Sequence, residues 1–321
     1  MRGLSLGIIS SMFFAVTFIL NRSMETAGGS WLWSSSLRFL FMVPFLILIV
    51  AFRKNLKAVF LEIKKAPVPW LAWSFTGFVL FYAPLTYAAA YGPGWLVAGT
   101  WQFTIIAGLL LAPFFYEMKQ GPSGLIKKRH NIQFRALAVS SVILIGVISI
   151  QVQNASGITT SQVVAGILPV ILAAFCYPLG NRKMMELCGD RLDTFQRILG
   201  MTLCSLPAWL VISMWAYIEV GVPQSSQVLQ SLIVAICSGI IATALFFIAT
   251  SRVRHDQGKL AGVEATQSTQ VLFVLAGEVA FFATPLPNGI AAAGMCLIVI
   301  GIILHTFNMR NGIPRRGYLK V

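Results

Sequence analysis

Long apolar runs alternate with short polar or basic stretches along the whole chain. Each run is about 20 residues long, which is the length that a helix needs to cross the hydrocarbon core of a membrane. Charged residues or Gly/Pro turns, such as YGPG at 91–94 and TPLP at 284–287, separate one run from the next. The pattern predicts ten transmembrane helices, at residues 4–24, 31–52, 69–91, 94–116, 134–153, 163–183, 194–217, 228–250, 260–283 and 287–308.

Composition supports a membrane protein. Of the 321 residues, 57% are hydrophobic and 11% are charged, and the mean hydropathy is +0.79, whereas soluble domains contain about 25% charged residues. The net charge of +14 would suit nucleic acid only if the basic residues shared one soluble face. They lie in short loops between apolar runs instead, so we expect a lipid bilayer around this chain and no nucleic acid partner.

The basic residues also predict how the helices cross the membrane. All but two of the 24 Lys and Arg residues lie in loops that alternate with loops almost free of them, and positive loops stay in the cytoplasm. Only Arg22 and Arg38 fall near the other face. We therefore predict a multi-pass protein of a prokaryotic plasma membrane with both termini cytoplasmic. The cytoplasmic basic segments are Arg2, 53–65, 117–135, 182–197, 252–259 and the tail after 309.

The two halves of the chain repeat each other. GIISSMFFAVTFILNRSME at 7–25 matches GILPVILAAFCYPLGNRKMME at 166–186, with one residue inserted before the shared Asn-Arg pair. Arg38 matches Arg197 at nearly the same offset. Because each copy holds five helices, the second copy must enter the membrane upside down. The sequence thus predicts two inverted five-helix repeats, residues 1–158 and 159–309, followed by a basic tail at 310–321.

The stretch from Gly262 to Phe282 has the length and apolarity of a membrane-spanning helix, yet it carries two glutamates, two glutamines and three hydroxyls. An acidic residue at membrane depth costs about 2.5–3.5 kcal/mol on insertion scales, so such a helix normally faces a wet cavity or a partner charge. In a regular helix Glu264 and Glu278 lie within about 40° of each other, with Gln267 on or beside the same face. The alternative is that each glutamate sits at a helix end in headgroup water.

Further motifs are RFLFMVPF in the second helix, the acidic Glu117 just past the fourth and GMCLIVIGIIL in the tenth. With the repeats, they make the chain resemble the drug/metabolite transporter superfamily, in particular its putative multidrug resistance efflux transporter family. The resemblance covers almost the whole chain. It implies an all-α membrane protein in which helices 1, 3, 4, 6, 8 and 9 enclose a cavity that opens alternately to each side.

The chain departs from that superfamily at three positions. Phe14 or Ala15 stands where the small multidrug resistance proteins carry a proton-coupling glutamate. Gln102 and Gln270 stand where proline is common in helices 4 and 9. The resemblance and its departures together move the predicted coupling site from helix 1 to helix 9.

Two arginines are candidate partners for the glutamates of helix 9. Arg38 and Glu278 lie at similar depth below the outer face, so an ion pair between them is feasible. Arg197 and Glu264 form the mirrored arrangement near the inner face. The alternatives are that Arg38 extends to the outer headgroups and that Arg197 belongs only to the cytoplasmic basic set.

Aromatic residues supply candidates for a cavity wall. Trp101 lies deep in helix 4 next to Gln102, where an indole can stack on a flat or cationic ligand. Tyr82 stands near Pro84 in helix 3, where a proline loosens the backbone ladder and permits gating. Simple core packing is the alternative for Tyr82.

These features favour a secondary transporter. We find no catalytic motif and no metal-ligand spacing, so we expect no enzyme activity, no cofactor and no metal. We predict export of a small organic solute by alternating access, in exchange for a proton carried by Glu264. An exporter of an amino acid or another metabolite, and a channel, are the alternatives, and the oligomeric state stays open. The predicted site residues are Arg38, Tyr82, Trp101, Gln102, Glu264, Gln267, Gln270 and Glu278.

Overall fold

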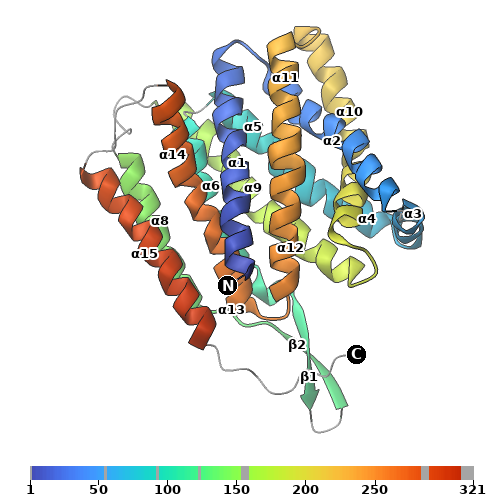
Figure 1. Cartoon of the computed structure of the whole chain (residues 1–321), viewed down its shortest axis with the longest axis vertical. Coiled ribbons are helices and arrows are strands. Elements are labelled where there is room, and N and C mark those ends of the chain that lie inside the picture. The colour runs from blue at the N-terminus through green and yellow to red at the C-terminus, as the bar shows by residue number, and fades with distance from the viewer. Residues whose placement is uncertain are drawn as a thin grey trace.

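A computed structural model of the chain describes residues 2–53, 56–91, 94–121, 124–152, 159–282 and 289–311. Helices that run along the long axis form a bundle, and a β-hairpin extends from the end at which α1 begins (Figure 1). The elements in chain order are α1 (Arg2–Thr26), α2 (Trp31–Phe52), α3 (Leu56–Lys65), α4 (Pro67–Ser74), η1 (Phe75–Val79), α5 (Leu80–Tyr91), α6 (Gly94–Trp101), α7 (Thr104–Leu110), η2 (Ala112–Phe114), β1 (Tyr116–Gly121), β2 (Gly124–Arg129), α8 (Phe134–Val152), α9 (Thr160–Cys188), α10 (Thr194–Val220), α11 (Ser225–Val234), η3 (Ala235–Ala242), α12 (Thr243–Val253), α13 (Gln257–Ala265), η4 (Thr266–Ser268), α14 (Thr269–Phe282) and α15 (Gly289–Asn311).

The membrane part of the molecule is all-helical. Within the described residues, six helical stretches are long and apolar enough to cross a membrane. Shorter apolar helices cover Leu96–Leu110, Phe134–Ile150 and Gly289–His305. The predicted count of ten spans is therefore supported only in part. The six long stretches are Gly3–Thr26, Trp31–Phe52, Pro67–Tyr91, Val163–Cys188, Thr194–Val220 and Ser225–Val253.

Two of the predicted cytoplasmic loops contain regular structure. The 53–65 segment holds α3, which packs through the buried Val59 and Glu62. The 117–135 segment holds most of an antiparallel hairpin, in which Tyr116 of β1 lies opposite Arg129 of β2. Periodicity of apolar runs could not show either element, because both are short and polar. The predicted YGPG and TPLP turns lie wholly or partly outside the described residues.

Two long helices contain a π-helical segment that the sequence pattern did not predict. The segment η1 joins α4 to α5, and η3 joins α11 to α12. Each carries a glycine at a close contact. A Cβ atom at Gly180 of α9 would collide with the backbone of Gly77 in η1, and one at Gly239 in η3 would collide with Met42 of α2. Small residues thus let these helices approach each other closely, and π segments recur at functional sites.

Two other helices are broken near their middle. A turn at Gln102 and Phe103 separates α6 from α7, and the 3₁₀ segment η4 separates α13 from α14. Hydroxyls of α1 satisfy carbonyls at such irregular points, as neighbouring side chains do in membrane proteins. Ser11 Oγ donates to the Thr266 carbonyl at 2.8 Å, and Ser10 Oγ donates to the Ala242 carbonyl at 2.8 Å.

The 3₁₀ segment η4 interrupts the single regular helix expected over 260–283. A 3₁₀ helix turns about 20° more per residue than an α-helix, so three such residues add about 60°. Because a regular helix leaves Glu264 and Glu278 about 40° apart in the opposite sense, the added turn still leaves the two positions within about 20° of each other. Their helices, α13 and α14, are separate elements.

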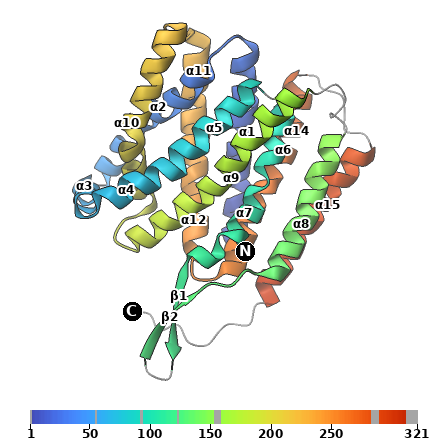
Figure 2. The same cartoon turned by 180° about the vertical axis from the view of Figure 1, so that it is seen from behind.

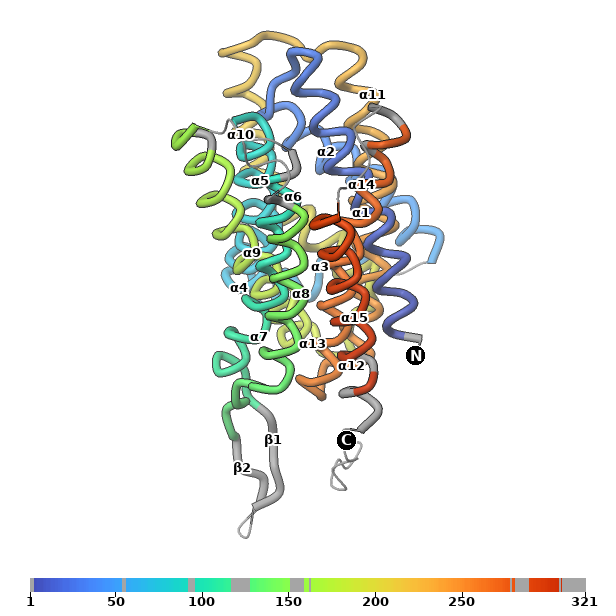
Figure 3. The backbone as a smooth tube through the Cα atoms, turned by 90° about the vertical axis from the view of Figure 1, so that its left-hand side faces the viewer, coloured from blue at the N-terminus to red at the C-terminus, as the bar shows by residue number. Residues whose placement is uncertain are grey.

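Helices α8 and α15 form a pair at one edge of the bundle (Figure 2) and face the viewer together in Figure 3. Glycines bring their backbones together. A Cβ atom at Gly146 would collide with the Gly294 carbonyl, and one at Gly301 would collide with Ile143. The pair contributes no side chain to the chamber described next.

Candidate functional site

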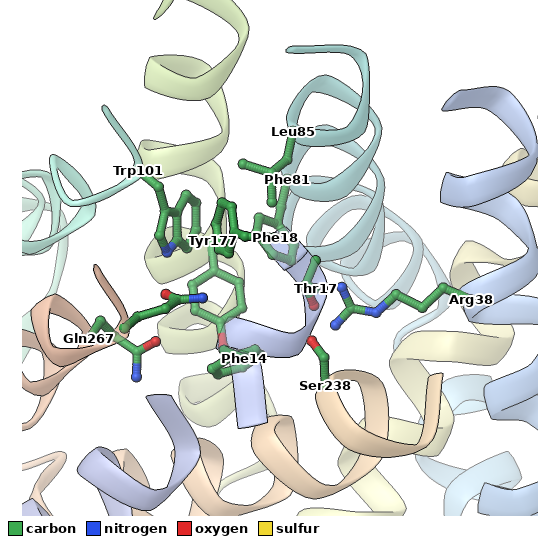
Figure 4. Close-up of a pocket in the computed structure, with 11 residues that line it drawn as sticks. Phe14, Thr17, Phe18, Arg38, Phe81, Leu85, Trp101, Tyr177, Ser238 and Gln267 are labelled. Carbon is green, nitrogen blue, oxygen red and sulfur yellow. The ribbon is translucent and has the colours of Figure 1, made fainter. Parts of the chain in front are cut away.

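A small chamber lies at the centre of the bundle (Figure 4). Its free volume is about 10 Å³, which is roughly the room for one water molecule. An organic solute therefore fits only after the surrounding helices move apart. The lining residues are Phe14, Thr17 and Phe18 of α1, Arg38 of α2, Phe81 and Leu85 of α5, Trp101 of α6, Tyr177 of α9, Ser238 of η3, Gln267 of η4 and Gln270 of α14.

Aromatic rings form one wall of the chamber. The ring centroids of Phe81 and Tyr177 are 4.6 Å apart, and those of Phe81 and Trp101 are 5.1 Å apart. Phe14 adds an edge-to-face contact to Tyr177 at 6.4 Å. The rings come from four different helices, so movement of any one helix changes the wall. Such a surface suits a flat apolar body, because aromatic groups prefer offset or edge-to-face contacts.

Arg38 supplies the charge in the chamber. Its side chain points from α2 toward Thr17 and Ser238 in Figure 4, and the residue is 2% exposed. The guanidinium carbon lies 4.1 Å from the centroid of the Tyr82 ring, a cation–π contact. Among the described side chains, no carboxylate forms a salt bridge with Arg38, and its Nε has no hydrogen-bond partner. The alternative in which Arg38 extends to the outer headgroups is wrong.

Several other polar atoms of the chamber also lack partners. A buried polar atom without a hydrogen bond costs about 1–3 kcal/mol, so a group of them around one space indicates that a water or ligand completes them. Gln267 and Gln270 come from the broken helix and were predicted as site residues. The unpartnered atoms, counted within the described part of the chain, are Thr17 Oγ1, Tyr177 Oη, Ser238 Oγ, Gln267 Nε2 and Gln270 Oε1.

Glu264 lies outside the chamber in a two-point ion pair with Arg182 of α9. Arg182 Nε donates to Glu264 Oε1 at 3.0 Å, and Nη2 donates to Oε2 at 2.7 Å. Arg182 Nη1 also donates to Gln257 Oε1 at 3.4 Å. Glu264 is 3% exposed and Arg182 is 4% exposed, so the alternative of a surface carboxylate is wrong. Gly108 of α7 leaves room for the pair, since a Cβ there would collide with Glu264 Oε2.

This pair corrects one expectation. Arg197 was the candidate partner for Glu264 in the sequence analysis. Arg197 instead lies with its guanidinium carbon 4.5 Å from the Phe247 ring centroid, and its Nε and Nη2 have no partner in the described residues. The true partner is Arg182, which belongs to the repeated Asn-Arg pair and could have been found from that motif.

The remaining predicted site residues divide as follows. Trp101 lines the chamber as expected. Tyr82 is not part of the lining, and its ring contacts the guanidinium of Arg38. Gln102 turns away, because its Nε2 donates to the Ala98 carbonyl at 3.1 Å. The Glu278 side chain lies outside the described residues, so its predicted pairing with Arg38 stays a prediction.

Most apolar residues that line the chamber were not predicted from the sequence. Phe14, Thr17 and Phe18 share one face of α1 through i, i+3 and i+4 spacing. Phe14 had a signal, because it stands at the position of the coupling glutamate in the small multidrug resistance proteins. Tyr177 and Ser238 carried no such signal in the sequence, since Tyr177 is a single aromatic residue and Ser238 a single small residue within an apolar run.

A second recess on the molecule is apolar. It has a volume of about 490 Å³ and lies between Trp31, α5 and α9. Its described lining contains no charged side chain, whereas the central chamber contains Arg38, so the central chamber is the better candidate site. The recess is lined by Trp31, Val79, Leu80, Ala83, Pro84, Tyr87, Leu168, Pro169 and Leu172.

Known proteins resemble this chain over its length. The model of the EmrE family, described as putative multidrug resistance efflux transporter, matches residues 1–311. The uncharacterized protein YjlA of Bacillus subtilis (strain 168) is 54% identical over 316 residues, which are 98% of both chains. An uncharacterized 42.1 kDa protein of Shouchella clausii, from the intracellular alkaline protease 3′ region, is 53% identical over 268 residues, covering 84% of this chain and 70% of that protein. A crystal structure of a protein with 16% identity has a TM-score of 0.70 and covers 96% of this chain and 97% of its own, which shows a shared fold alone.

Proposed function

The chain belongs to the EmrE family of putative multidrug resistance efflux transporters, as its motifs predicted, and we propose that it is a secondary active transporter that exports small organic solutes. Its family is one of transporters and not of enzymes. The observation that carries the proposal is the small central chamber with an aromatic wall and unpartnered polar atoms. A carrier must hold its solute in such a space between two openings.

We further propose that ten helices form two inverted repeats of five, residues 1–158 and 159–309. The third helix of each half contains a π segment, η1 or η3, and the fourth helix of each half is broken. In each second helix an arginine lies over an aromatic ring, Arg38 over Tyr82 and Arg197 over Phe247. These matched features support the repeat, because they recur in the same order. The basic tail at 310–321 and both termini would then be cytoplasmic.

Labelling of single cysteine reporters tests this topology. Reporters near residues 57, 125, 256 and 315 should be shielded from an impermeant reagent in intact cells, and one near 157 should react. The positive-inside distribution of Lys and Arg is the reason. Equal labelling at 125 and 157 would overturn the orientation or the span count.

The contracted chamber favours alternating access over a channel. Its free volume of about 10 Å³ is too small for an organic solute, so the helices around it must move before a solute can enter, as alternating access requires. The helices around the chamber contain the π segment η3, the 3₁₀ segment η4 and Pro84. Such points locally weaken the α-helical ladder, so they are the places at which we expect the chamber to open.

We propose that the Arg182–Glu264 pair couples transport to a proton. The pair joins α9 to α13, and Gln267 of the chamber lies one turn beyond Glu264. When α9 and α13 separate, Glu264 loses Arg182, and a proton can then neutralise the carboxylate instead. In each conformational cycle Glu264 would exchange the guanidinium of Arg182 for one proton, so one proton would accompany each cycle.

Reconstituted protein provides the test of export and coupling. Proteoliposomes with an imposed proton gradient should accumulate solutes from a panel of organic anions, neutral metabolites and lipophilic cations. The double variant Arg182→Gln with Glu264→Gln should fold but lose uphill transport and solute-induced proton release, while Glu278→Gln serves as the acidic control. A fully coupled double variant would end the proposal for Glu264, and absence of transport for every solute would end the proposal of an exporter.

A further inference from the structure

We infer that the solute of the central chamber is a monoanion with a flat apolar body, such as an aromatic carboxylate. This inference rests on the proposed transport function and names the class of solute for the same site. It follows from three observations: the charge of Arg38, the aromatic wall beside it and the positions of the two glutamines.

Within the described residues, the charge in the chamber is positive and has no counter-ion. Arg38 is the charged member of the described lining, and at 2% exposure it is almost fully removed from solvent. A buried guanidinium without a counter-ion is costly, because burial removes its hydration. An anion in the chamber would supply the missing acceptor through a charge-assisted hydrogen bond to Nε, which has none within the described residues.

A single negative charge matches this site better than two. One guanidinium faces the chamber, and the two other buried arginines are turned elsewhere. Arg182 is occupied by Glu264, and Arg197 lies over Phe247 outside the lining. A dianion would keep one charge unpaired in a buried site.

The rest of the lining selects the body of the solute. Phe81, Trp101 and Tyr177 present ring faces and edges on the side away from Arg38 (Figure 4). Gln267 and Gln270 offer an unpartnered amide donor and an unpartnered carbonyl acceptor. The solute would therefore place its anionic group at Arg38 and its ring on the aromatic wall, with any polar substituent on the glutamines.

The same features disfavour a lipophilic cation. A cation would bring a second positive charge beside Arg38, and the described lining contains no carboxylate to offset it. Glu264 already accepts two hydrogen bonds from Arg182. Outward movement of an anion and inward movement of a proton are both favoured by an inside-negative potential, so this solute class agrees with proton exchange.

Three ligands with one ring system test the inference. Binding of 2-naphthoate, 2-naphthamide and 2-naphthylmethylammonium would be measured by calorimetry on the purified protein in lipid nanodiscs, with empty nanodiscs as the blank. We expect 2-naphthoate to bind about tenfold to a hundredfold more tightly than the amide, the range of one hydrogen bond to a charged group. The ammonium compound should bind more weakly than the amide.

Matched variants assign the effect to Arg38. Arg38→Gln should remove the preference for 2-naphthoate over the amide, and Arg38→Lys should keep part of it. Arg197→Gln is the control, because it removes an equally buried arginine that does not line the chamber. Glu278→Gln tests the predicted pairing with Arg38, because a rise in affinity for 2-naphthoate would show that Glu278 neutralises Arg38 in the free protein and would overturn the inference.

Tighter binding of the ammonium compound than of 2-naphthoate would overturn the inference, as would a preference for the anion that survives Arg38→Gln. Failure of all three compounds to bind would also remove flat aromatic monoanions as ligands. Uphill transport of cations in the proteoliposome assay would keep the exporter while excluding the anion class, so the two proposals fail separately.

Discussion

Arg182 and Arg38 are two buried arginines of one helical bundle with opposite surroundings. Glu264 accepts two hydrogen bonds from Arg182, at 3.0 and 2.7 Å, so both charges are compensated. Arg38 lies on the ring of Tyr82 and faces a chamber whose described lining contains no carboxylate. The first arrangement joins two helices, and the second leaves a charge available to a solute. Burial of an arginine alone therefore does not reveal its role; its partner does.

The largest expected effect comes from breaking the compensated pair. Arg182→Gln or Glu264→Gln alone should lower the free energy of unfolding by about 3–5 kcal/mol, because each strands the other charge inside the bundle. The double variant should recover most of that loss. Thermal unfolding of purified protein, with folded yield from size-exclusion chromatography, measures the cycle. Additive losses would show that the pair does not exist in the folded protein.

A smaller effect should follow from crowding the same pair. Gly108→Ala places a methyl group against Glu264 Oε2, and overpacking of a buried site typically costs about 1–3 kcal/mol. Gly3→Ala is the control, since a Cβ there makes only ordinary contact with Val263. Unfolding temperatures of the two variants give the comparison. Equal stability would mean that α7 yields without strain at Gly108.

A second set of ion pairs, between Glu62 of α3 and the side chains of Lys65 and Arg191, should matter less and respond to pH. Hydrogen bonds from Lys65 and then from Arg191 lower the pKa of Glu62 below its ordinary value of 4.5. The ionised carboxylate of Glu62 contributes its full stabilisation of the folded protein above pH 4.5, the ordinary pKa. That stabilisation is lost as pH falls through the lowered pKa of Glu62 in the folded protein. We expect about 1 kcal/mol or less, because Arg191 is largely exposed.

Glu62→Gln isolates this contribution. Wild type and variant should differ in unfolding temperature at pH 7 and should converge once pH falls below the lowered pKa of Glu62, since protonated Glu62 resembles glutamine. A difference that persists at low pH would assign the effect to packing of α3 rather than to charge.

The smallest coupling is expected between Arg38 and Glu278. Arg38 faces η3 through Gly239, while Figure 1 shows α1 between α14 and the α11–α12 helix. Single and double changes to glutamine should therefore be additive in unfolding free energy within about 0.5 kcal/mol. A milder double variant would establish the ion pair that the sequence made feasible. Such a result would also weaken the anion site.

Prediction from sequence succeeded where the signal is local. Hydrophobic length placed most membrane helices within a few residues of their observed bounds, as for 31–52 and α2. It failed at the irregular points, since η1, η3 and η4 consist of residues that also suit a regular α-helix. Their shape depends on contacts with other helices, including the hydrogen bonds from Ser10 and Ser11 of α1.

The candidate site divides in the same way. Four residues that line the chamber were predicted from the sequence, namely Arg38, Trp101, Gln267 and Gln270. They could be predicted because a polar or bulky residue in an apolar run is conspicuous and is costly without a function. The lining from Phe14, Tyr177 and Ser238 was not predicted, because apolar runs contain many such residues. Only the rotation of each helix about its axis decides which of them face inward.

The sequence by itself determined that this chain is a helical membrane protein, the family to which it belongs and the polar residues at membrane depth. Composition and the spacing of charges carry that information without reference to any distant contact. The tertiary structure alone decided that Glu264 pairs with Arg182, 82 residues away, and that Arg38 faces an uncompensated chamber. Depth along a helix follows from counting residues, whereas the partner of a charge depends on which helices adjoin and how each is turned.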